Sequence, residues 1–271
     1  MKITKMQGAG NDYLYFFEEP PADVKERSIR LCDRHFGIGA DGLIYISESA
    51  AADFRMRIFN ADGSEAGMCG NGIRCVAKYV YARGYTDQTE LRIETQSGIR
   101  EVKLHRKGAE VTAVSVNMGK VTVSKPVTAK IGGISYLIHP VSVGNPHAVI
   151  ITDQSGLGLP ERIGSEIEHY PMFPGGVNAE FVTVLSENRI RMRVWERGSG
   201  VTLACGTGAC ASAAVCTAEG LCAGGQPVIA ELDGGELELT VQEDGTVWMK
   251  GPAEFVFEAE VQIEGEDGWQ Q

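Results

Sequence analysis

Runs of residues in which apolar side chains dominate or alternate with polar ones predict short strands throughout the first half of the chain. The predicted strands are residues 2–6, 13–17, 43–46, 54–59, 91–95, 100–105 and 110–116. Apolar positions at helical spacing predict one helix over residues 24–35. A second helix is expected to begin after Cys69 and to run to Arg83, because Gly84 is a typical helix stop.

The second half of the chain shows the same order of elements. Strands are predicted within residues 135–151 and over 181–185, 189–195, 228–232, 236–241 and 247–249, and helices near residues 160–169 and after Cys205. Each helix lies among several consecutive strands instead of alternating with single strands. This order is typical of an α+β protein whose sheets are mostly antiparallel or mixed.

Two short segments of the sequence occur twice at one spacing. The segment RMRIFN at residues 55–60 recurs as RMRVWE at residues 191–196, which is 136 residues later. The segment CGNG that begins at Cys69 recurs as CGTG at Cys205, again 136 residues later. A spacing shared by two unrelated segments indicates an internal duplication.

A third pair supports the duplication, since the Gly-Asn at residues 10–11 recurs at residues 144–145, 134 residues later. We therefore predict two pseudo-symmetric domains, each a mostly antiparallel or mixed sheet wrapped around a central helix. The boundary is expected near residues 118–120, so that the domains are residues 1–118 and 119–251.

Composition and charge exclude several classes of protein. With 43% hydrophobic and 23% charged residues in 271, the chain is a folded protein of a length that suits two domains. The net charge of −11 is concentrated in residues 198–271, which hold 13 acidic residues and one basic residue. No basic stripe could neutralise phosphates, so we expect no nucleic-acid partner. Residues 198–218 carry no charge, but their small side chains predict a buried helix and no membrane span.

The cysteines indicate a reducing compartment. There are seven, an odd number, in a chain much larger than the small secreted domains that disulfides stabilise. The first eight residues alternate polar and apolar side chains and show no signal-peptide core. We expect a cytoplasmic protein with reduced thiols.

Cys69 and Cys205 each stand directly before a Gly-x-Gly that opens a predicted helix. The first N–H groups of a helix lack partners within it, and together with the helix dipole they attract an anion such as a carboxylate. Glycine lets a ligand approach the backbone closely. The same positive end favours thiolate over thiol, so these cysteines could have a pKa below the usual value of about 8.5.

The duplication suggests how the two cysteines could act together. If the halves pack as pseudo-twofold mates, both helix starts face one cleft and the thiols reach one substrate from opposite sides. One thiolate would remove a proton from a carbon and the other thiol would return one, which inverts that centre. This is two-base racemase or epimerase chemistry, with the helix N-termini stabilising the substrate carboxylate.

Other uses of the cysteines and glycines are less favoured. The remaining cysteines are expected in the core, because a cysteine usually behaves as a small apolar residue; they are Cys32, Cys75, Cys210, Cys216 and Cys222. The chain has no Cys-x-x-Cys, so we predict no metal site. Residues 37–42 match the Gly-x-Gly-x-x-Gly of dinucleotide-binding proteins, but they follow a helix and precede a strand, the reverse of that motif. We expect no cofactor.

At this point the sequence resembles a known family. Residues 60–75 (NADGSEAGMCGNGIRC) and 196–210 (ERGSGVTLACGTGAC) look like the two signature segments of diaminopimelate epimerases. Residues 7–12, 144–147 and 251–253 fit the same family, so the resemblance covers nearly the whole chain. It implies the cofactor-independent interconversion of LL- and meso-2,6-diaminoheptanedioate, a step toward lysine and peptidoglycan.

The resemblance also implies a role for each matching residue. Cys69 and Cys205 match the acid–base pair, and the helix starts that hold the reacting carboxylate match Gly70, Asn71, Gly206 and Thr207. The polar substrate ligands match Asn11, Asn60, Asn145 and Asn178. Glu196 and Arg197 match the pair that recognises the distal ammonium and carboxylate, a role that suits their charges. His147 and Glu196 match residues that adjust the thiol pKa values.

The chain departs from the family pattern at two positions. Gly42 stands where some members have a glutamine, so that side-chain contact is absent. Phe257 stands where a tyrosine is associated with dimer contacts, which keeps the ring without the hydroxyl. The resemblance further implies a homodimer, and that residues 252–271 rejoin the first domain.

Two alternative functions remain open from the residues. One is a proline or hydroxyproline racemase, or an isomerase, of the same duplicated fold. The other is a non-catalytic protein that binds a small amino acid at the helix starts. Glu196 and Arg197 beside Cys205 favour the epimerase, because proline has no distal zwitterion for them to recognise.

Overall fold

A computed structural model describes residues 1–153, 156 and 158–261 of the chain. The elements of the first half are β1 (Lys2–Gly8), β2 (Asn11–Phe17), α1 (Val24–Cys32), β3 (Gly42–Ser47), β4 (Phe54–Asn60), β5 (Glu65–Ala66), α2 (Gly70–Ala82), β6 (Glu90–Thr95), β7 (Gly98–Lys107) and β8 (Glu110–Lys120). None of the helices in the described residues is long and apolar enough to cross a membrane.

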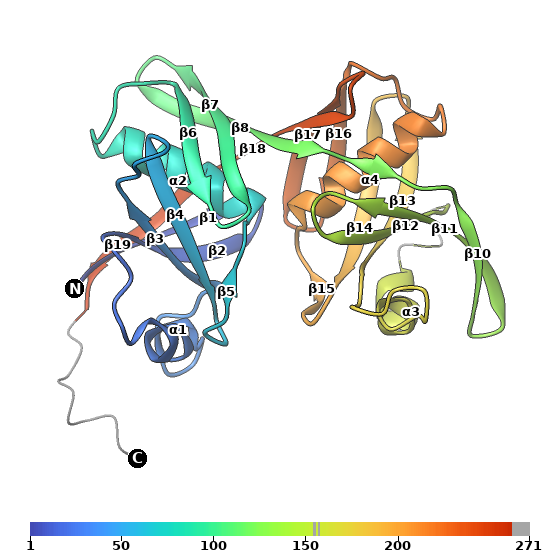
Figure 1. Cartoon of the computed structure of the whole chain (residues 1–271), viewed down its shortest axis with the longest axis horizontal. Coiled ribbons are helices and arrows are strands. Elements are labelled where there is room, and N and C mark those ends of the chain that lie inside the picture. The colour runs from blue at the N-terminus through green and yellow to red at the C-terminus, as the bar shows by residue number, and fades with distance from the viewer. Residues whose placement is uncertain (154–155, 157, 262–271) are drawn as a thin grey trace.

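The elements of the second half are β9 (Thr122–Val123), β10 (Val127–Ile131), β11 (Ile134–Ser142), β12 (Pro146–Ile151), α3 (Leu159–Glu168), β13 (Asn178–Ser186), β14 (Arg189–Glu196), β15 (Gly200–Thr202), α4 (Gly206–Ala218), β16 (Pro227–Leu232), β17 (Gly235–Val241), β18 (Thr246–Gly251) and β19 (Glu254–Glu260). Figure 1 shows two lobes side by side, with α2 surrounded by strands in one and α4 in the other.

The pairing of strands is the same in both lobes. In the first, β1–β2, β3–β4, β6–β7 and β7–β8 are antiparallel, while β2–β3 and β4–β6 are parallel. In the second, β11–β12, β13–β14, β16–β17 and β17–β18 are antiparallel, while β12–β13 and β14–β16 are parallel. The predicted duplicated α+β fold with mixed sheets is therefore confirmed.

The two lobes are joined where β8 and β18 pair as antiparallel strands, for example at Val116 and Met249 (Figure 1). Beyond this crossing each chain segment continues into the other lobe: β19 pairs with β1, and β9 pairs with β11. Residues 262–271, the rest of the segment expected to rejoin the first lobe, lie outside the described residues.

Each central helix is buried because strands surround it. In α2, ten residues in a row after Gly70 are buried, and in α4 the small side chains of Ala209, Ala211 and Ala213 are fully buried. A helix enclosed on all sides needs no polar face, and small residues let strands pack close to it. The predicted buried helix of small residues is confirmed.

The first helix ends earlier than predicted. Helix α1 stops at Cys32 because Asp33 adopts an extended backbone, with ψ of 124°. The Asp33 carboxylate then accepts hydrogen bonds from the backbone N–H groups of His35 and Phe36, each at 2.7 Å. An aspartate that bonds its own downstream backbone competes with the helix and favours a turn.

A buried arginine ties α2 to the crossing segment. Arg74 is 0% exposed, and its guanidinium donates to the carbonyl oxygens of Gly70 at 3.2 Å and Pro252 at 3.0 Å. Pro252 follows β18 directly, at the point where the chain returns to the first lobe. The start of α2 is thus fixed to the junction between the lobes.

Met249 on β18 is fully buried between the starts of α2 and α4, since a Cβ on Gly70 would lie 2.7 Å from its Cε and one on Gly206 3.1 Å from its Sδ. We predict that Met249→Ala leaves a cavity there and lowers the free energy of unfolding by about 2–5 kcal/mol, measured by urea denaturation. Leu185→Ala on β13, where the side chain is 41% exposed, is the control and should cost far less. Equal losses in both variants would contradict this packing.

Candidate active site

Each of the two repeated cysteines caps a central helix. Cys69 is the N-cap of α2 and its Sγ accepts a hydrogen bond from the N–H of Gly72 at 3.3 Å. Cys205 is the N-cap of α4 and its Sγ accepts from the N–H of Gly208 at 3.4 Å. A thiol sulfur thus takes the place of the side-chain oxygen that usually caps a helix.

The glycines after the cysteines are required by packing behind the helix starts. A Cβ on Gly72 would lie 2.6 Å from Ile44 Cδ1, and one on Gly208 would lie 2.7 Å from Glu180 Oε1. A side chain at either position would displace Ile44 or Glu180. The sequence suggests that these glycines let a ligand approach, whereas at these two positions the neighbours are the protein's own side chains.

The starts of the two helices meet at Asn71. Its Nδ2 donates to Asn11 Oδ1 at 3.4 Å in its own lobe and to the carbonyl oxygen of Ala204 at 3.5 Å in the other. Its Oδ1 is buried and, among the described residues, has no hydrogen-bond partner. A Cβ on Gly206 would lie 3.7 Å from this oxygen. An acceptor without a partner therefore faces the place where α2 and α4 converge.

Around Cys69 the hydrogen-bonding groups come from β2. The Tyr13 hydroxyl donates to Sγ at 3.6 Å, and the thiol donates to Asn11 Oδ1 at 3.3 Å. The sequence predicts Asn11 here but not Tyr13, because Tyr13 lies in an apolar run that is typical of a core strand. Its position two residues after Asn11 on a strand was the available signal, since alternate residues face the same side.

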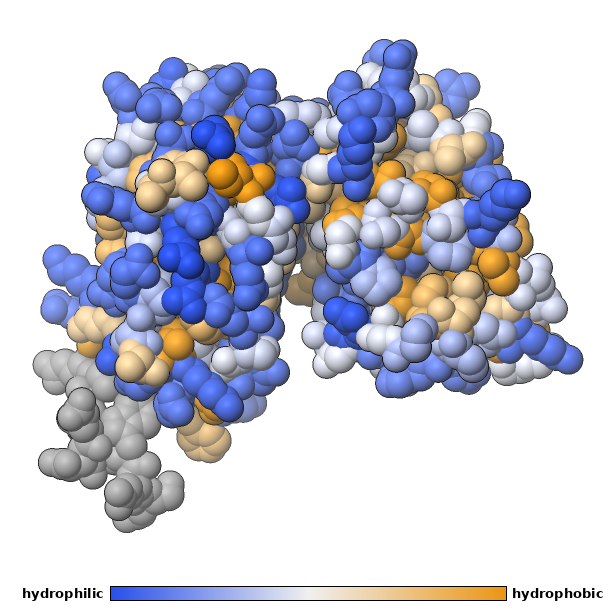
Figure 2. All heavy atoms as spheres, viewed as in Figure 1, coloured by the Kyte–Doolittle hydropathy of each residue, from blue (hydrophilic) through white to orange (hydrophobic). Residues whose placement is uncertain are grey.

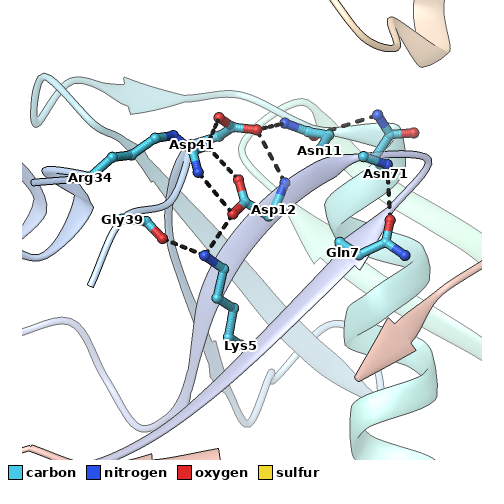
Figure 3. Close-up of polar contacts among 9 residues, drawn as sticks. Lys5, Gln7, Asn11, Asp12, Arg34, Gly39, Asp41 and Asn71 are labelled. Carbon is cyan, nitrogen blue, oxygen red and sulfur yellow. Dashed lines mark hydrogen bonds and ion pairs between the residues drawn. The ribbon is translucent and has the colours of Figure 1, made fainter. Parts of the chain in front are cut away.

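Asn11 is held by a network of charged groups at the edge of the first lobe (Figure 3). Its Nδ2 donates to Asp41 Oδ2 at 2.6 Å, and the same oxygen accepts from the N–H of Asp12 at 3.1 Å. Arg34 bridges Asp12 at 2.7 Å and Asp41 at 2.8 Å, while Lys5 pairs with Asp12 at 2.8 Å. These partners orient the Asn11 amide so that its oxygen points at Cys69.

Gly42 cannot be replaced by a glutamine in this structure. A Cβ there would lie 2.3 Å from the carbonyl oxygen of Phe59 and 2.9 Å from Tyr13 Cε1. The ring of Tyr13 therefore packs against the backbone of Gly42 itself. The backbone of Phe59 and the ring of Tyr13 thus leave no room for a side chain at this position.

Around Cys205 the groups differ from those around Cys69. Sγ lies 3.5 Å from the Thr207 hydroxyl, and the negative charge of the Glu196 carboxylate raises the pKa of the thiol. The hydroxyl of Thr202 donates to Glu196. Asn145 donates to the Thr207 hydroxyl at 3.4 Å. Thr207 thus contacts the thiol directly, while Glu196 acts on it through its charge.

His147 is fully buried and does not contact Cys205 itself. Its Nε2 lies 3.1 Å from Asn145 Oδ1 and its Nδ1 lies 2.7 Å from Glu180 Oε1. Glu180 is also 0% exposed. The sequence does not predict it as part of the site, because a glutamate at the start of an apolar strand is usually a surface residue. Burial raises its pKa, which His147 partly offsets.

Three further predicted residues lie near the distal part of the site. Asn178 accepts a hydrogen bond from the backbone N–H of Arg197 at 2.9 Å. The Arg197 guanidinium is exposed and donates to the carbonyl oxygen of Gly175 at 3.1 Å. Asn60 donates to the Ser64 hydroxyl at 3.0 Å. The structure therefore groups Asn178 with Arg197, while the amide of Asn60 bonds its own turn.

A cleft of about 840 Å³ lies between the lobes, where Figure 2 shows the surface hollowed. Asn11, Asn60 and Glu196 line it, and Tyr13, Asp41, Thr202 and Ala204 contribute to its walls. Its outer part is lined by charged side chains from both lobes, namely Arg34, Asp62, Arg193 and Asp233. Among the described residues no group of three His, Cys, Asp or Glu side chains could hold a metal ion.

Burial controls the ionisation of both thiols. It raises the pKa of Cys69, and the N–H groups of Gly72 and Asn71 and the Tyr13 hydroxyl only partly offset it. The pKa of Cys205 lies well above its ordinary value, because burial is joined there by the negative charges of Glu196 and Glu180. The expected lowering by the helix N-terminus is wrong for both thiols, since desolvation outweighs it.

The arrangement supports proton transfer at a carbon that carries a carboxylate. Two thiols stand at two converging helix starts, whose N–H groups and dipoles attract an anion. The side-chain oxygens of Asn11 and of Asn71, the latter without a partner among the described residues, can accept hydrogen bonds from an ammonium. An α-amino acid offers both groups on one carbon, so the site can bind one and exchange its α-proton.

Comparisons with known proteins agree over nearly the whole chain. The model of a family described as diaminopimelate epimerase matches residues 3–124 and 140–256. A diaminopimelate epimerase from Phocaeicola vulgatus is 45% identical over 97% of this chain and 99% of its own length. One from Bacteroides thetaiotaomicron is 47% identical over 97% of this chain and 98% of its own length.

Solved structures share the fold at much lower identity. A Bacillus anthracis phenazine biosynthesis protein of the PhzF family superposes with a TM-score of 0.76 at 17% identity, covering 97% of this chain and 99% of the other. A probable proline racemase from Agrobacterium radiobacter, with bound carbonate, gives 0.74 at 16% identity, covering 98% and 94%. At such identities the likeness shows the duplicated fold alone.

Proposed function

The chain belongs to the diaminopimelate epimerase family, and we propose that Cys69 and Cys205 are the acid–base pair of its reaction. The protein is an isomerase that interconverts LL- and meso-2,6-diaminoheptanedioate, a step of lysine biosynthesis. The single observation that carries the assignment of the two thiols is their identical placement, as N-caps of two buried helices whose starts meet at Asn71.

In the proposed reaction, one thiolate removes the α-proton of the substrate and becomes a thiol. The opposite thiol gives its proton to the other face of the same carbon and becomes a thiolate. One C–H bond breaks and one forms, so the centre inverts and the charge of the pair is unchanged. Because thiols serve as both acid and base, the step needs no cofactor.

The reacting carboxylate is proposed to lie at the two helix starts. In α2 the N–H of Ile73 bonds the carbonyl oxygen of Cys69 and that of Gly72 bonds its sulfur, and Cys205 engages Ala209 and Gly208 in the same way. The N–H groups before these belong to Gly70, Asn71, Gly206 and Thr207, the four residues implied by the resemblance. Their positive ends stabilise the charge that develops on the carboxylate as the α-proton leaves.

The ammonium beside the reacting carbon fits the acceptors near it. Asn71 Oδ1 is buried with no partner in the part of the chain that the structure describes, and Asn11 Oδ1 accepts from Cys69 and from the Asn71 amide. A bound ammonium would supply the donor that Asn71 lacks, and its positive charge favours ionisation of a neighbouring thiol. Substrate binding in this pose would therefore offset part of the rise in thiol pKa that burial causes.

The distal zwitterion is proposed to be recognised by Glu196, Arg197, Asn60 and Asn178. Glu196 already lines the cleft, and its charge raises the pKa of the Cys205 thiol. The guanidinium of Arg197 leaves the Gly175 carbonyl and turns to the distal carboxylate, a movement that its exposure allows. Asn145 and His147 act on the Cys205 side through Thr207.

The same reasoning extends to domain limits and compartment. We propose domains of residues 1–118 with 252–271, and 119–251, a division supported by the pairing of β19 with β1 and of β9 with β11. A reduced cytoplasmic protein is supported by its cysteines, all seven of which are free thiols.

A homodimer is proposed through β19. Phe255, Val256 and Phe257 on this strand are 36%, 51% and 41% exposed, which is unusual for three large apolar residues in a row. β19 pairs with β1 along one edge, and the strand exposes side chains along nearly its whole length. Such an edge favours association with a second copy.

The alternative functions are not favoured. The likeness to a proline racemase rests on 16% identity, whereas the named epimerases are 45–47% identical over nearly their full length. A binding protein without catalysis would not need two thiols at two helix starts.

We predict that Cys69→Ser and Cys205→Ser each lower kcat for LL-diaminopimelate by at least about 10²-fold, because a hydroxyl is a far weaker base than a thiolate. The assay follows formation of the meso isomer, with proline as a comparison substrate. Cys75→Ala and Cys210→Ala, buried six and five residues further along the same helices, are matched controls and should retain most activity. Near-normal turnover in either serine variant would refute the acid–base pair.

We predict that Phe257→Asp converts a dimer to a monomer, because a carboxylate cannot be buried in an apolar contact. The measurement is molar mass by light scattering after size exclusion. Val127→Asp on β10, where the side chain is equally exposed at 41%, is the control and should leave the mass unchanged. A dimer that persists in Phe257→Asp would place the contact elsewhere.

A further inference from the structure

The assigned function makes no direct use of Glu180, a carboxylate at 0% exposure on β13. Its Oε1 lies 2.7 Å from Nδ1 of His147, which is also 0% exposed, and its Oε2 is buried without a partner in the described residues. A buried carboxylate is costly to retain, and an apolar side chain often fills such a place at no loss of stability. Packing alone therefore does not explain the presence of Glu180.

A continuous chain of hydrogen bonds leads from Glu180 to the thiol of Cys205. From His147 it continues through Nε2 to Asn145 Oδ1 at 3.1 Å. Asn145 Nδ2 donates to the Thr207 hydroxyl at 3.4 Å, and this hydroxyl lies 3.5 Å from Cys205 Sγ. All the groups in this chain are side chains, so the protonation of Glu180 and His147 can determine the orientation of the Thr207 hydroxyl.

The number of protons on each group determines which atom donates in each hydrogen bond of this chain. An amide oxygen only accepts, so His147 Nε2 must carry a proton and donate to Asn145. The amide then presents its NH₂ to Thr207, whose oxygen accepts. The hydroxyl proton of Thr207 is thereby left to point at the sulfur of Cys205, where it stabilises a thiolate.

Glu180 determines which nitrogen of His147 carries the proton, because its carboxyl group faces Nδ1. A neutral imidazole carries one proton, on Nδ1 or on Nε2. The carboxyl group of Glu180 can share a proton with Nδ1, so that Nε2–H is retained. Without it, a neutral His147 could move its proton to Nδ1, and Nε2 would then repel the oxygen of Asn145.

The first lobe has no such chain, although its backbone is the same. His147 pairs with Asn178 in β12–β13 as Tyr13 pairs with Gly42 in β2–β3, so Tyr13 corresponds to His147 and Ile44 corresponds to Glu180. The hydroxyl of Tyr13 reaches Cys69 directly at 3.6 Å. Ile44 shows that an apolar side chain fits this position behind a helix start.

We propose that Glu180 is a positioning residue for Cys205, acting through His147, Asn145 and Thr207 to keep a hydroxyl proton directed at that thiol. The proposal rests on the acid–base role of Cys205. Two carboxylates oppose the ionisation of Cys205 through their negative charge, that of Glu196 on β14 and that of Glu180 itself. The oriented hydroxyl of Thr207 offsets part of that opposition.

The test compares Glu180→Leu with Glu180→Gln in the full-length protein. Leucine removes the partner of Nδ1, whereas the amide of glutamine can donate to Nδ1 and retain the proton on Nε2. The readout is the rate of alkylation by iodoacetamide at Cys69 and at Cys205 between pH 7 and 10, measured for each peptide by mass spectrometry. Because no substrate is present, a failure of the catalytic role of Cys205 would not disturb this readout.

Both variants lack the charge of Glu180, so their difference reports the orientation of the hydroxyl alone. We expect Cys205 of Glu180→Leu to be alkylated about tenfold more slowly than Cys205 of Glu180→Gln at pH 8, the effect of one lost hydrogen bond to a charged group, with Cys69 unchanged. Glu180→Gln should react at least as fast as the native protein, and its His147 should show a protonated Nε2 by ¹⁵N NMR. A Cys205 that reacts equally fast in the leucine and glutamine variants, or an equal difference at both cysteines, would overturn the proposal.

A second variant keeps the test valid if Glu180→Leu does not fold. Thr207→Val removes only the hydroxyl at the end of the chain and preserves the shape of the side chain. It should slow the alkylation of Cys205 by a similar factor and leave Cys69 unchanged. Native rates at both cysteines in a folded Thr207→Val protein would also overturn the proposal.

Discussion

The sulfurs of Cys69 and Cys205 each accept a backbone N–H from the residue three positions on, and these two contacts determine where α2 and α4 begin. Because the sulfur caps the helix, the proposed acid–base atom and the positive end of the helix dipole lie together. The glycines that follow allow Ile44 and Glu180 to pack against the helix starts. The crossing of β8 and β18 then brings the two starts together, with Met249 between them.

Within this symmetric frame the two thiols have different surroundings. Cys69 receives the hydroxyl of Tyr13 and lies near the buried charge of Arg74, which lowers its pKa slightly. Cys205 faces Glu196 and Glu180, whose charges add to the effect of burial. Cys69 is therefore easier to ionise than Cys205 in this structure. An enzyme that inverts a centre needs one thiolate and one thiol, and this difference favours Cys69 as the thiol that ionises first.

Much of the fold could be predicted from the sequence. Two segments recur at one spacing, and the apolar periodicity predicts the same order of strands and helices in both halves. The helix starts were predicted from Cys-Gly-x-Gly, a local signal. The end of α1 was not, since it depends on how the Asp33 carboxylate bonds the following backbone. Short strands such as β5 and β15 were also missed, because pairing and not periodicity defines them.

The candidate site shows the same limit. Resemblance supplied Asn11, Glu196 and Asn178. Only the alternation along β2 after Asn11 pointed to Tyr13 and no pattern pointed to Glu180, because the strand register places both behind the helix starts. The predicted lowering of the thiol pKa values was wrong for a related reason. A helix N-terminus can be recognised along the chain, whereas desolvation depends on how the folded chain packs around the thiol.

The central idea is that each thiol serves one face of the same carbon. The most direct measurement is the initial-rate conversion of LL-diaminopimelate in deuterated water, with mass spectrometry of both the product and the remaining substrate. Two thiols predict that the product carries one deuterium at the inverted carbon while the remaining substrate keeps its hydrogen, because the proton delivered comes from the thiol that had exchanged with solvent. Deuterium that enters the remaining substrate as fast as the product would show a single base and contradict the two-thiol site.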